Sequence, residues 1–277
     1  MTSAIDPFFA VISVLVGSVL GSFFNVLIYR LPRHESIVWP GSHCPQCGRS
    51  IRAWENIPVV SFIFLRGRCA GCRARIQIFY PLVELCTAAA AFILFLFLVT
   101  PTMASPHSAV QVIFLVLEIL ILLMVIPIAV IDLFHFIIPD SITLPLLLLA
   151  VLYSFLPGGI TPLQCGLGIL AGGGSLFAVG LIGEYVFKKG ESMGGGDVKL
   201  MALVGAVFGW KTAFLTIMFG AITGSVGGLT LLALKKFSKD HKIPFGPFLA
   251  LGLWIAVLGG DRLLSLYQTL LDRLIGY

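Results

Sequence analysis

Long apolar runs alternate with short polar segments along this chain of 277 residues. A helix that spans a membrane needs about 20 predominantly apolar residues. By that measure the pattern predicts about eight transmembrane helices, near residues 8–30, 79–99, 110–131, 141–156, 163–187, 198–209, 212–234 and 244–260. The runs 141–156 and 198–209 are short, and a half-length helix is tolerated where it packs inside protein or lines a wet cavity. We therefore expect an all-α polytopic membrane protein whose reaction site lies near such a helix.

The composition agrees with this expectation. Hydrophobic residues make up 58% of the chain and charged residues 11%, and the mean hydropathy is +1.03. A soluble globular domain would carry about 25% charged residues. The net charge of +5 could indicate a nucleic-acid partner, but the basic residues lie in short segments between apolar runs, where Lys and Arg mark the cytoplasmic side. We therefore expect the lipid bilayer, and no nucleic acid, as a partner.

The basic residues also predict the orientation. They gather around the first long loop and beside two later runs, whereas the connections 100–109 and 157–162 contain neither Lys nor Arg. The three groups are Arg30, Arg33, Arg49, Arg52, Arg66, Arg68, Arg73 and Arg75, then Lys188, Lys189 and Lys199, then Lys235, Lys236, Lys239 and Lys242. Because cytoplasmic loops carry the excess of Lys and Arg, we expect the first loop in the cytoplasm and the N-terminus outside.

These boundaries divide the chain into four parts. Residues 1–30 form the first transmembrane helix, residues 31–78 a cytoplasmic loop domain, and residues 79–260 the remaining transmembrane helices. The tail 261–277 alternates apolar residues with Asp261, Arg262, Asp272 and Arg273, which predicts an amphipathic helix on the membrane surface. No Lys or Arg precedes the first run, so it lacks the basic flank of a cleaved signal peptide and is expected to be retained.

The loop 31–78 contains two close pairs of cysteines, which are Cys44 with Cys47 and Cys69 with Cys72. A gap of two residues lets both sulfurs of a pair turn toward one ion, and the 21 residues between the pairs are close to the spacing of four-cysteine zinc sites. Gly48 and Gly71 are expected to supply the tight turns. The pattern predicts a structural zinc ion that helps a loop with little core to fold. Disulfides or free thiols are the alternatives, which a cytoplasmic position disfavours.

In residues 194–197, an acid directly follows three glycines at the edge of an apolar run. A charge there is costly unless it is paired with an opposite charge, hydrated or needed for function, so an acid at membrane depth is a functional candidate by default. By the order of the spans, Asp132 lies at the cytoplasmic end of the third span and Asp197 at the cytoplasmic start of the sixth. Two neighbouring carboxyls cannot both ionise easily, so one can act as an acid and the other as a base toward water. We therefore predict Asp132 and Asp197 as the catalytic pair of an aspartyl protease.

The polar residues around this pair have several interpretations. Gly194 and Gly196 permit close approach of a substrate backbone, and together with Lys199 they are candidate substrate-positioning residues. Lys199 can instead extend to the lipid headgroups. Asp140 lies between a proline and a serine and is interpreted as the cap of the next helix. Glu118 lies in mid-span, where a charge costs about 2.5 kcal/mol or more, so it is expected to be protonated or to face the bundle interior.

Five motifs in this order resemble the type IV prepilin peptidase family, a class of Gly-x-Gly-Asp intramembrane aspartyl proteases. They are residues 21–32, the cysteine pairs with Trp54 and residues 56–58, residues 80–84, residues 131–132 with 138–140, and residues 194–200. The resemblance covers most of the chain. Gly194, Gly196 and Asp197 are the positions that match the family signature, and Gly195 fills its variable position.

The resemblance implies cleavage of a type IV prepilin or pseudopilin leader after a glycine, on the cytoplasmic side of the bacterial inner membrane. It also implies methylation of the new N-terminus with S-adenosylmethionine as the donor, in pilus or type II secretion systems. Asp132 and Asp197 would be the catalytic pair, and the four cysteines the zinc ligands. Two alternatives fit the same residues: a proton-coupled transporter that uses Glu118 with both aspartates as a relay, and a membrane methyltransferase without protease activity.

Overall fold

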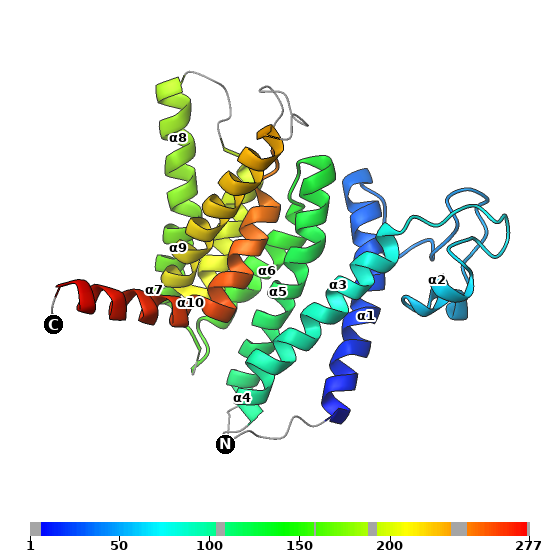
Figure 1. Cartoon of the computed structure of the whole chain (residues 1–277), viewed down its shortest axis with the longest axis horizontal. Helices are drawn as coiled ribbons and strands as arrows, with labels where there is room; N and C mark the ends of the chain where they lie inside the picture. Colours follow the sequence, from blue (N-terminus) through cyan, green and yellow to red (C-terminus); the bar gives the residue numbers. More distant parts are fainter. Residues whose placement is uncertain (1–6, 104–108, 158, 188–192, 234–242, 276–277) are drawn as a thin grey trace. The chain divides into compact units, whose positions relative to one another are not determined.

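The computed structural model describes residues 7–103, 109–157, 159–187, 193–233 and 243–275, and its regular structure in these ranges is helical (Figure 1). The elements are α1 (Pro7–Arg30), η1 (Leu31–Arg33), η2 (Ala53–Asn56), α2 (Val60–Phe64), α3 (Phe79–Leu94), η3 (Phe95–Val99), α4 (Thr100–Met103), α5 (Ala109–His135), α6 (Asp140–Tyr153), α7 (Pro162–Ile169), η4 (Leu170–Gly174), α8 (Ser175–Phe187), α9 (Gly195–Ala233) and α10 (Gly246–Ile275). The described residues form no strand, so the prediction of an all-α fold is confirmed.

Five helices in the described ranges are long and apolar enough to cross a membrane by length and composition. They are Pro7–Arg33, Phe79–Val99, Ala109–His135, Pro162–Val186 and Gly195–Thr230, and Asp140–Tyr153 and Gly246–Gly260 are shorter apolar helices. Each predicted run coincides with one of these helices, and the number differs because the runs 198–209 and 212–234 share the long helix α9. Large apolar side chains such as Val11, Leu15 and Val19 are exposed on α1, where a bilayer would cover them. The chain is a multi-pass membrane protein.

Helix α9 is interrupted at Gly209, whose backbone angles are φ 79 and ψ 173. This conformation is essentially restricted to glycine. The interruption ends a first segment, residues 195–208, before the rest of the helix continues. The short helix predicted at 198–209 therefore exists as the first segment of α9.

The chain divides into two compact units, residues 1–107 and 108–277. In the first unit, α1 and α3 pack against each other in antiparallel order. A Cβ atom on Gly17 would lie 2.6 Å from the Cβ of Ala91, and one on Gly21 would lie 2.6 Å from the Cα of Glu84. The two glycines therefore let the helix backbones come into contact, which is a common means of helix association in lipid.

In the second unit, α9 packs on α6, α7, η4 and α10. A Cβ on Gly168 would overlap the carbonyl oxygen of Gly205, and a Cβ on Gly172 would overlap that of Met201. Gly168 and Gly172 therefore allow close helix packing. This contact fixes the first segment of α9, which carries Asp197, against the α7–η4 segment.

The tail that follows residue 260 continues α10 as far as Ile275, so it is helical as expected. Most of the lysines used to predict the orientation lie outside the described residues; they are Lys188, Lys189, Lys235, Lys236, Lys239 and Lys242.

Candidate functional site

Asp132 lies in the last turn of α5 and is buried, with 6% of the residue exposed. The helix ends because Phe136 adopts a left-handed conformation (φ 57), and its N–H donates to the carbonyl oxygen of Asp132 at 2.9 Å. The Asp132 Oδ2 atom accepts a 2.8 Å hydrogen bond from the backbone N–H of Gly246, the first residue of α10. The start of α10 thus presents a helix N-terminus to the carboxylate, which favours negative charge there.

Asp197 is the third residue of α9 and is also buried, with 9% of the residue exposed. A Cβ on Gly194 would lie 2.8 Å from Asp197 Oδ2, and a Cβ on Gly196 would lie 2.8 Å from the Cβ of Ile138 in the segment between α5 and α6. A Cβ on Gly195, by contrast, would meet nothing within 4 Å. The space around the three residues therefore explains why the signature needs glycine at its first and third positions and leaves the second free.

Asp132 and Asp197 come together in the second unit, close enough to interact electrostatically. Helix α10 packs on both α5 and α9, the helices that carry the two acids. Two buried carboxyls that interact in this way can share one proton and offer one acid and one base. Glu118 lies 14 residues (132 − 118) before Asp132 on α5, which is about 21 Å along the helix axis. Along α5, no other acid lies between Glu118 and Asp132.

Gly246 contributes to this site although no sequence motif pointed to it. A Cβ at this position would lie 2.7 Å from Oδ2 and 3.0 Å from Cγ of Asp132. The available signal was its position between Phe245 and Pro247 at the start of an apolar run. A glycine at a helix start leaves its N–H open to an acceptor from elsewhere in the chain.

Lys199 and Asp140 form an ion pair, with the lysine Nζ 2.8 Å from both carboxylate oxygens. Their side chains are 43% and 52% exposed. The interpretation of Asp140 as a helix cap is wrong, because the cap position of α6 is Pro139 and Asp140 is the first helical residue. The pair joins the start of α6 to the first turn of α9, and a role for Lys199 in positioning substrate stays a prediction.

The four cysteines of the loop form one cluster in the first unit. The Sγ atoms of Cys44, Cys47, Cys69 and Cys72 all lie within 4.8 Å of one another. Those of Cys44 and Cys72 are 3.9 Å apart, whereas a disulfide bond is about 2.05 Å long. All four are free, so the disulfide alternative is wrong. Hydrogen bonds from the backbone N–H groups of Cys72 and Gly71 lower the pKa of the Cys69 thiol to about 6. The cluster could hold one metal ion.

The two cysteine pairs have the same backbone arrangement. In each pair, the N–H of the first cysteine donates to the carbonyl oxygen of the residue five positions later. The N–H of the residue four positions later donates to the carbonyl oxygen of the first cysteine. All four bonds measure 2.9 to 3.0 Å. The residue four positions after the first cysteine adopts a left-handed conformation in both pairs; it is Gly48 (φ 69) in the first and Arg73 (φ 62) in the second. The expectation that Gly71 supplies the second turn is wrong. Its N–H donates to Cys69 Sγ at 3.4 Å, and its small size accommodates Arg49, whose Nε would lie 3.0 Å from a Cβ there.

An ion pair ties η2 to the first cysteine pair. Arg49 Nη2 lies 2.6 Å from Glu55 Oε2, which also accepts the N–H of Arg52 at 3.1 Å. The hydrogen bond from Arg49 holds the pKa of the Glu55 carboxyl below its ordinary value, and the same bond raises the pKa of Arg49. The Glu55 side chain is only 4% exposed. The pair therefore keeps a buried carboxylate satisfied beside the cluster.

Comparisons with protein families match two parts of the chain. Residues 15–98 match the bacterial peptidase A24 N-terminal domain, and residues 119–229 match the type IV leader peptidase family. The first range contains the four cysteines, and the second contains Asp132 and Asp197.

Several curated relatives are similar over nearly the whole chain. The prepilin leader peptidase/N-methyltransferase of Pseudomonas putida is 35% identical over 295 residues, which cover 97% of this chain and 97% of the relative. The proteins of the same name from Pseudomonas aeruginosa (35% identical; 94% and 93% covered) and Aeromonas hydrophila (34% identical; 92% and 92% covered) are similar as well. No solved structure gives a significant match. With this identity along its full length and both domain matches in order, the chain belongs to the type IV leader peptidase family.

Proposed function

We propose that this chain is an intramembrane aspartyl endopeptidase that removes the leader of type IV prepilins or pseudopilins after a glycine and then methylates the new N-terminus. The family and the relatives named prepilin leader peptidase/N-methyltransferase support this reaction class. The observation that carries the proposal is the meeting of Asp132 and Asp197 as buried carboxyls within one unit.

In the proposed reaction, a water molecule between the two carboxyls attacks the scissile carbonyl carbon. Asp132 is the base that takes a proton from this water, because the hydrogen bond from Gly246 stabilises its carboxylate form. Asp197 carries the shared proton and donates it to the carbonyl oxygen as negative charge develops there. When the carbon–nitrogen bond breaks, Asp132 returns its proton to the departing amine, and Asp197 recovers a proton from the hydroxyl group that becomes the new carboxyl.

The substrate would approach along the turn before α9. Gly194 and Gly195 are exposed there while Asp197 beside them is buried. Residues without side chains leave room for a substrate backbone next to the acid. Lys199 lies in the same turn of α9 as Asp197 and is paired with Asp140 of α6. It is a candidate for a further contact with the substrate.

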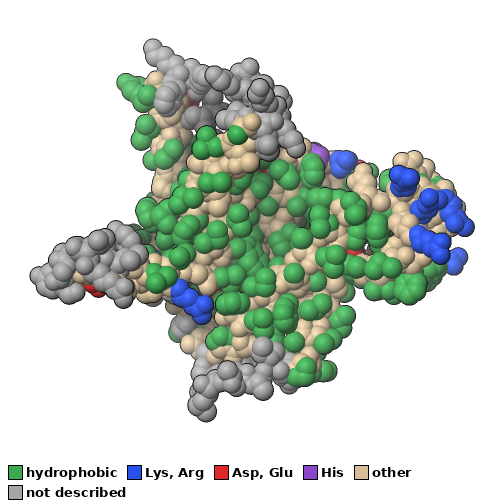
Figure 2. Space-filling model, viewed as in Figure 1, with side chains coloured by type: hydrophobic (Ala, Val, Ile, Leu, Met, Phe, Trp, Pro, Cys, Tyr) green, Lys and Arg blue, Asp and Glu red, His purple; other side chains and the backbone are tan. Residues whose placement is uncertain are grey.

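We assign the active site and the loop 31–78 to the cytoplasmic side of the inner membrane, with the N-terminus outside. The concentration of arginine on the loop supports this orientation. Exposed basic side chains gather over the segment around α2 (Figure 2) and include Arg52, Arg66, Arg68, Arg73 and Arg75.

Zinc is the metal that fits the cysteine cluster. A tetrahedral site with zinc–sulfur distances of about 2.3 Å has sulfurs about 3.8 Å apart, close to the 3.9 Å between Cys44 and Cys72. The hydrogen bond from the Gly71 N–H to Cys69 Sγ favours the thiolate that metal binding needs. Four thiolate ligands would leave no open position for water or substrate, so the ion would stabilise the loop and take no part in cleavage.

The proposal is tested by incubating the purified chain, in detergent or nanodiscs, with a prepilin and S-adenosylmethionine and measuring the mass of the product. The expected product has lost the leader and gained one methyl group. Without S-adenosylmethionine, cleavage should continue and the methyl group should be absent. A methylated but uncleaved product would contradict the protease, a cleaved but unmethylated product would contradict the methyltransferase, and an unchanged prepilin would contradict both and favour the transporter alternative.

A further inference from the structure

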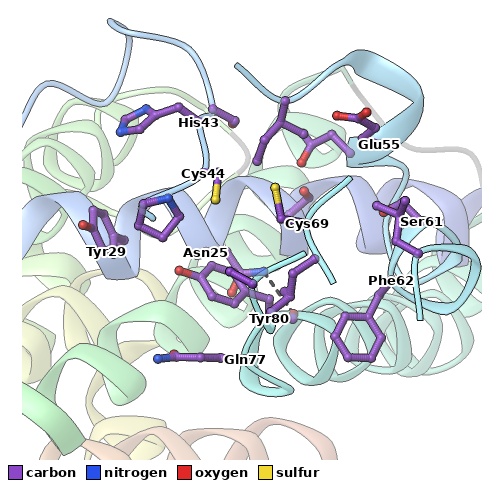
Figure 3. A pocket seen from close by; sticks show the side chains of 18 of the residues that line it. Asn25, Tyr29, His43, Cys44, Glu55, Ser61, Phe62, Cys69, Gln77 and Tyr80 are labelled. Carbon is purple, nitrogen blue, oxygen red and sulfur yellow. Dashed lines mark hydrogen bonds between the residues drawn. The ribbon is translucent and has the colours of Figure 1, made fainter. Parts of the chain in front are cut away.

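A cavity of about 510 Å³ lies within the first unit, between the loop-side turns of α1 and α3 and the loop 31–78 (Figure 3). This volume is in the range of small-molecule and cofactor sites. All residues that line the cavity belong to the first unit, whereas Asp132 and Asp197 belong to the second. A concave site of this size with several converging polar groups calls for a ligand of its own.

Aromatic side chains from three elements line the cavity. They are Tyr29 of α1, Phe62 of α2 and Tyr80 of α3, and Figure 3 shows all three around it. Asn25 Nδ2 donates to the carbonyl oxygen of Tyr80 at 3.0 Å, which fixes the start of α3 against α1. This bond uses the backbone of Tyr80, whose side chain is among those that line the cavity. Rings held in this way are suited to stack on a planar heterocycle.

Several charged groups at the cavity are already engaged. The guanidinium of Arg30 donates to the carbonyl oxygens of Ser36 and Pro40 at 2.8 and 2.6 Å, so its role is to fold the loop. Arg49 is paired with Glu55. These groups build the wall of the cavity and offer little to a ligand.

Arg33, which also lines the cavity, lies over one face of the Tyr29 ring at 4.1 Å from its centroid, so it is engaged as well. Glu84 and Arg75 are the charged groups left to consider. Glu84 of α3 is buried, with 9% of the residue exposed, and accepts the Val59 N–H at 2.7 Å through Oε2. Arg75 also lines the cavity, is exposed, and forms no ion pair among the described residues. The cavity thus combines aromatic rings with a buried carboxylate and an accessible guanidinium.

This combination matches the chemistry of S-adenosylmethionine. Its adenine is a planar heterocycle that stacks on aromatic rings. Its sulfonium and ammonium groups are cations that aromatic faces and carboxylates attract, and its carboxylate suits a guanidinium. When bound, this donor supplies an electrophilic methyl group. The amine nitrogen forms a bond to the methyl carbon as the carbon–sulfur bond breaks, the sulfur keeps the electron pair, and the amine proton passes to water.

We infer that this cavity is the binding site for S-adenosylmethionine, with Tyr29 and Tyr80 holding the adenine, Glu84 facing the cationic end and Arg75 binding the carboxylate. The inference rests on the proposed methyltransferase activity and deepens it, because it assigns the donor to the first unit. It uses residues of the motifs at 21–32 and 80–84, to which the cleavage mechanism gives no role.

Direct binding tests the site without reference to turnover. S-adenosylmethionine binding to the purified full chain is measured by calorimetry for wild type, Tyr29→Ala, Tyr80→Ala and Tyr80→Phe. Loss of a stacking ring should weaken binding about tenfold or more, whereas Tyr80→Phe should bind nearly as wild type. Trp54→Ala is the matched control, since Trp54 is an aromatic residue of the same loop that is 54% exposed and does not line the cavity. Unchanged affinity in both alanine variants would overturn the inference.

A second measurement covers the case in which an alanine variant fails to fold, which its metal content and gel-filtration profile would reveal. Ultraviolet crosslinking of radiolabelled S-adenosylmethionine to the wild-type chain, followed by peptide mapping, should label residues 22–33, 42–46 or 75–84. Label confined to residues 108–277 would overturn the inference. So would crosslinking of a photoreactive leader peptide to these segments without competition from S-adenosylmethionine, because the cavity would then be a peptide site.

The two proposals fail in different ways. If wild type cleaves and methylates prepilin while its donor crosslinks map elsewhere, the proposed function stands and only the position of the site is wrong. If wild type neither methylates prepilin nor binds S-adenosylmethionine, the methyltransferase proposal fails and the site falls with it.

Discussion

The backbone N–H of Gly246 donates a 2.8 Å hydrogen bond to Oδ2 of Asp132, a residue 114 positions earlier in the chain. Asp132 stands at the C-terminal end of α5, where the dipole of its own helix disfavours a negative charge. The N-terminus of α10 counteracts that effect, because the N–H of its first residue donates to the acid. The start of α10 is therefore part of the candidate active site.

Replacing Gly246 with alanine should impair cleavage. The new Cβ would lie 2.7 Å from the carboxylate oxygen, so Asp132 would have to move. A shift of about 1 Å in a catalytic group can lower the rate about 100-fold. The rate of prepilin cleavage in detergent measures the effect. Gly166→Ala is the control, because a Cβ there meets nothing within 4 Å, and a Gly246→Ala enzyme as fast as this control would show that Asp132 does not depend on the contact.

The three glycines before Asp197 should respond differently to alanine. Gly194→Ala would push the carboxyl group of Asp197, and Gly196→Ala would push Ile138 and the segment between α5 and α6. Both should cleave prepilin more slowly by about tenfold or more. The Cβ added in Gly195→Ala would meet no atom within 4 Å, so this variant should cleave prepilin as fast as wild type does. Parallel assays of the three variants decide the matter, and equal activities in all three would contradict the steric explanation of the motif.

Gly209 should be sensitive to substitution for a reason of backbone conformation alone. Its angles, φ 79 and ψ 173, lie in a region that other residues adopt only with strain, although a Cβ would have room. Gly209→Ala should lower the free energy of unfolding by about 1–3 kcal/mol. Denaturation of the purified protein in detergent, again beside Gly166→Ala, gives the value. Equal stability of the two variants would mean that α9 can pass this point in an ordinary helical conformation.

Metal removal should unfold the loop 31–78. We expect about one zinc ion per chain in the purified protein, and treatment with a strong chelator should make this loop far more sensitive to protease. Cys44→Ser should lose the metal, whereas Cys86→Ser, a change outside the cluster, should keep it. Elemental analysis and limited proteolysis measure both effects. A loop that stays resistant after complete metal removal would contradict a structural role for the ion.

The sequence predicted the helices well, because long apolar runs dictate helical structure in a membrane. The same pattern could not show how the runs at 198–209 and 212–234 are joined. Trp210 and Lys211 look like a break between two helices, yet the helix continues and only Gly209 leaves the helical conformation. That outcome depends on the angles of one residue, which hydropathy does not report.

The two acids were predictable from their position at the ends of apolar runs, but their partners were not. The contact between Gly246 and Asp132 joins residues 114 apart, and that between Lys199 and Asp140 joins residues 59 apart. Such pairs depend on how the helices pack. The turn in the second cysteine pair was misassigned for a local reason, since Arg73 and not Gly71 adopts the left-handed conformation.

The central claim is that Asp132 and Asp197 form one catalytic pair, and single-turnover cleavage of a purified prepilin tests it most directly. Asp132→Asn and Asp197→Asn should each lower the cleavage rate by about a thousandfold or more. The double variant should be no slower than the singles, because the two groups act as a unit. Asp272→Asn, which changes an exposed acid near the end of α10, should cleave at close to the wild-type rate. Near-normal cleavage by either single variant would contradict the account.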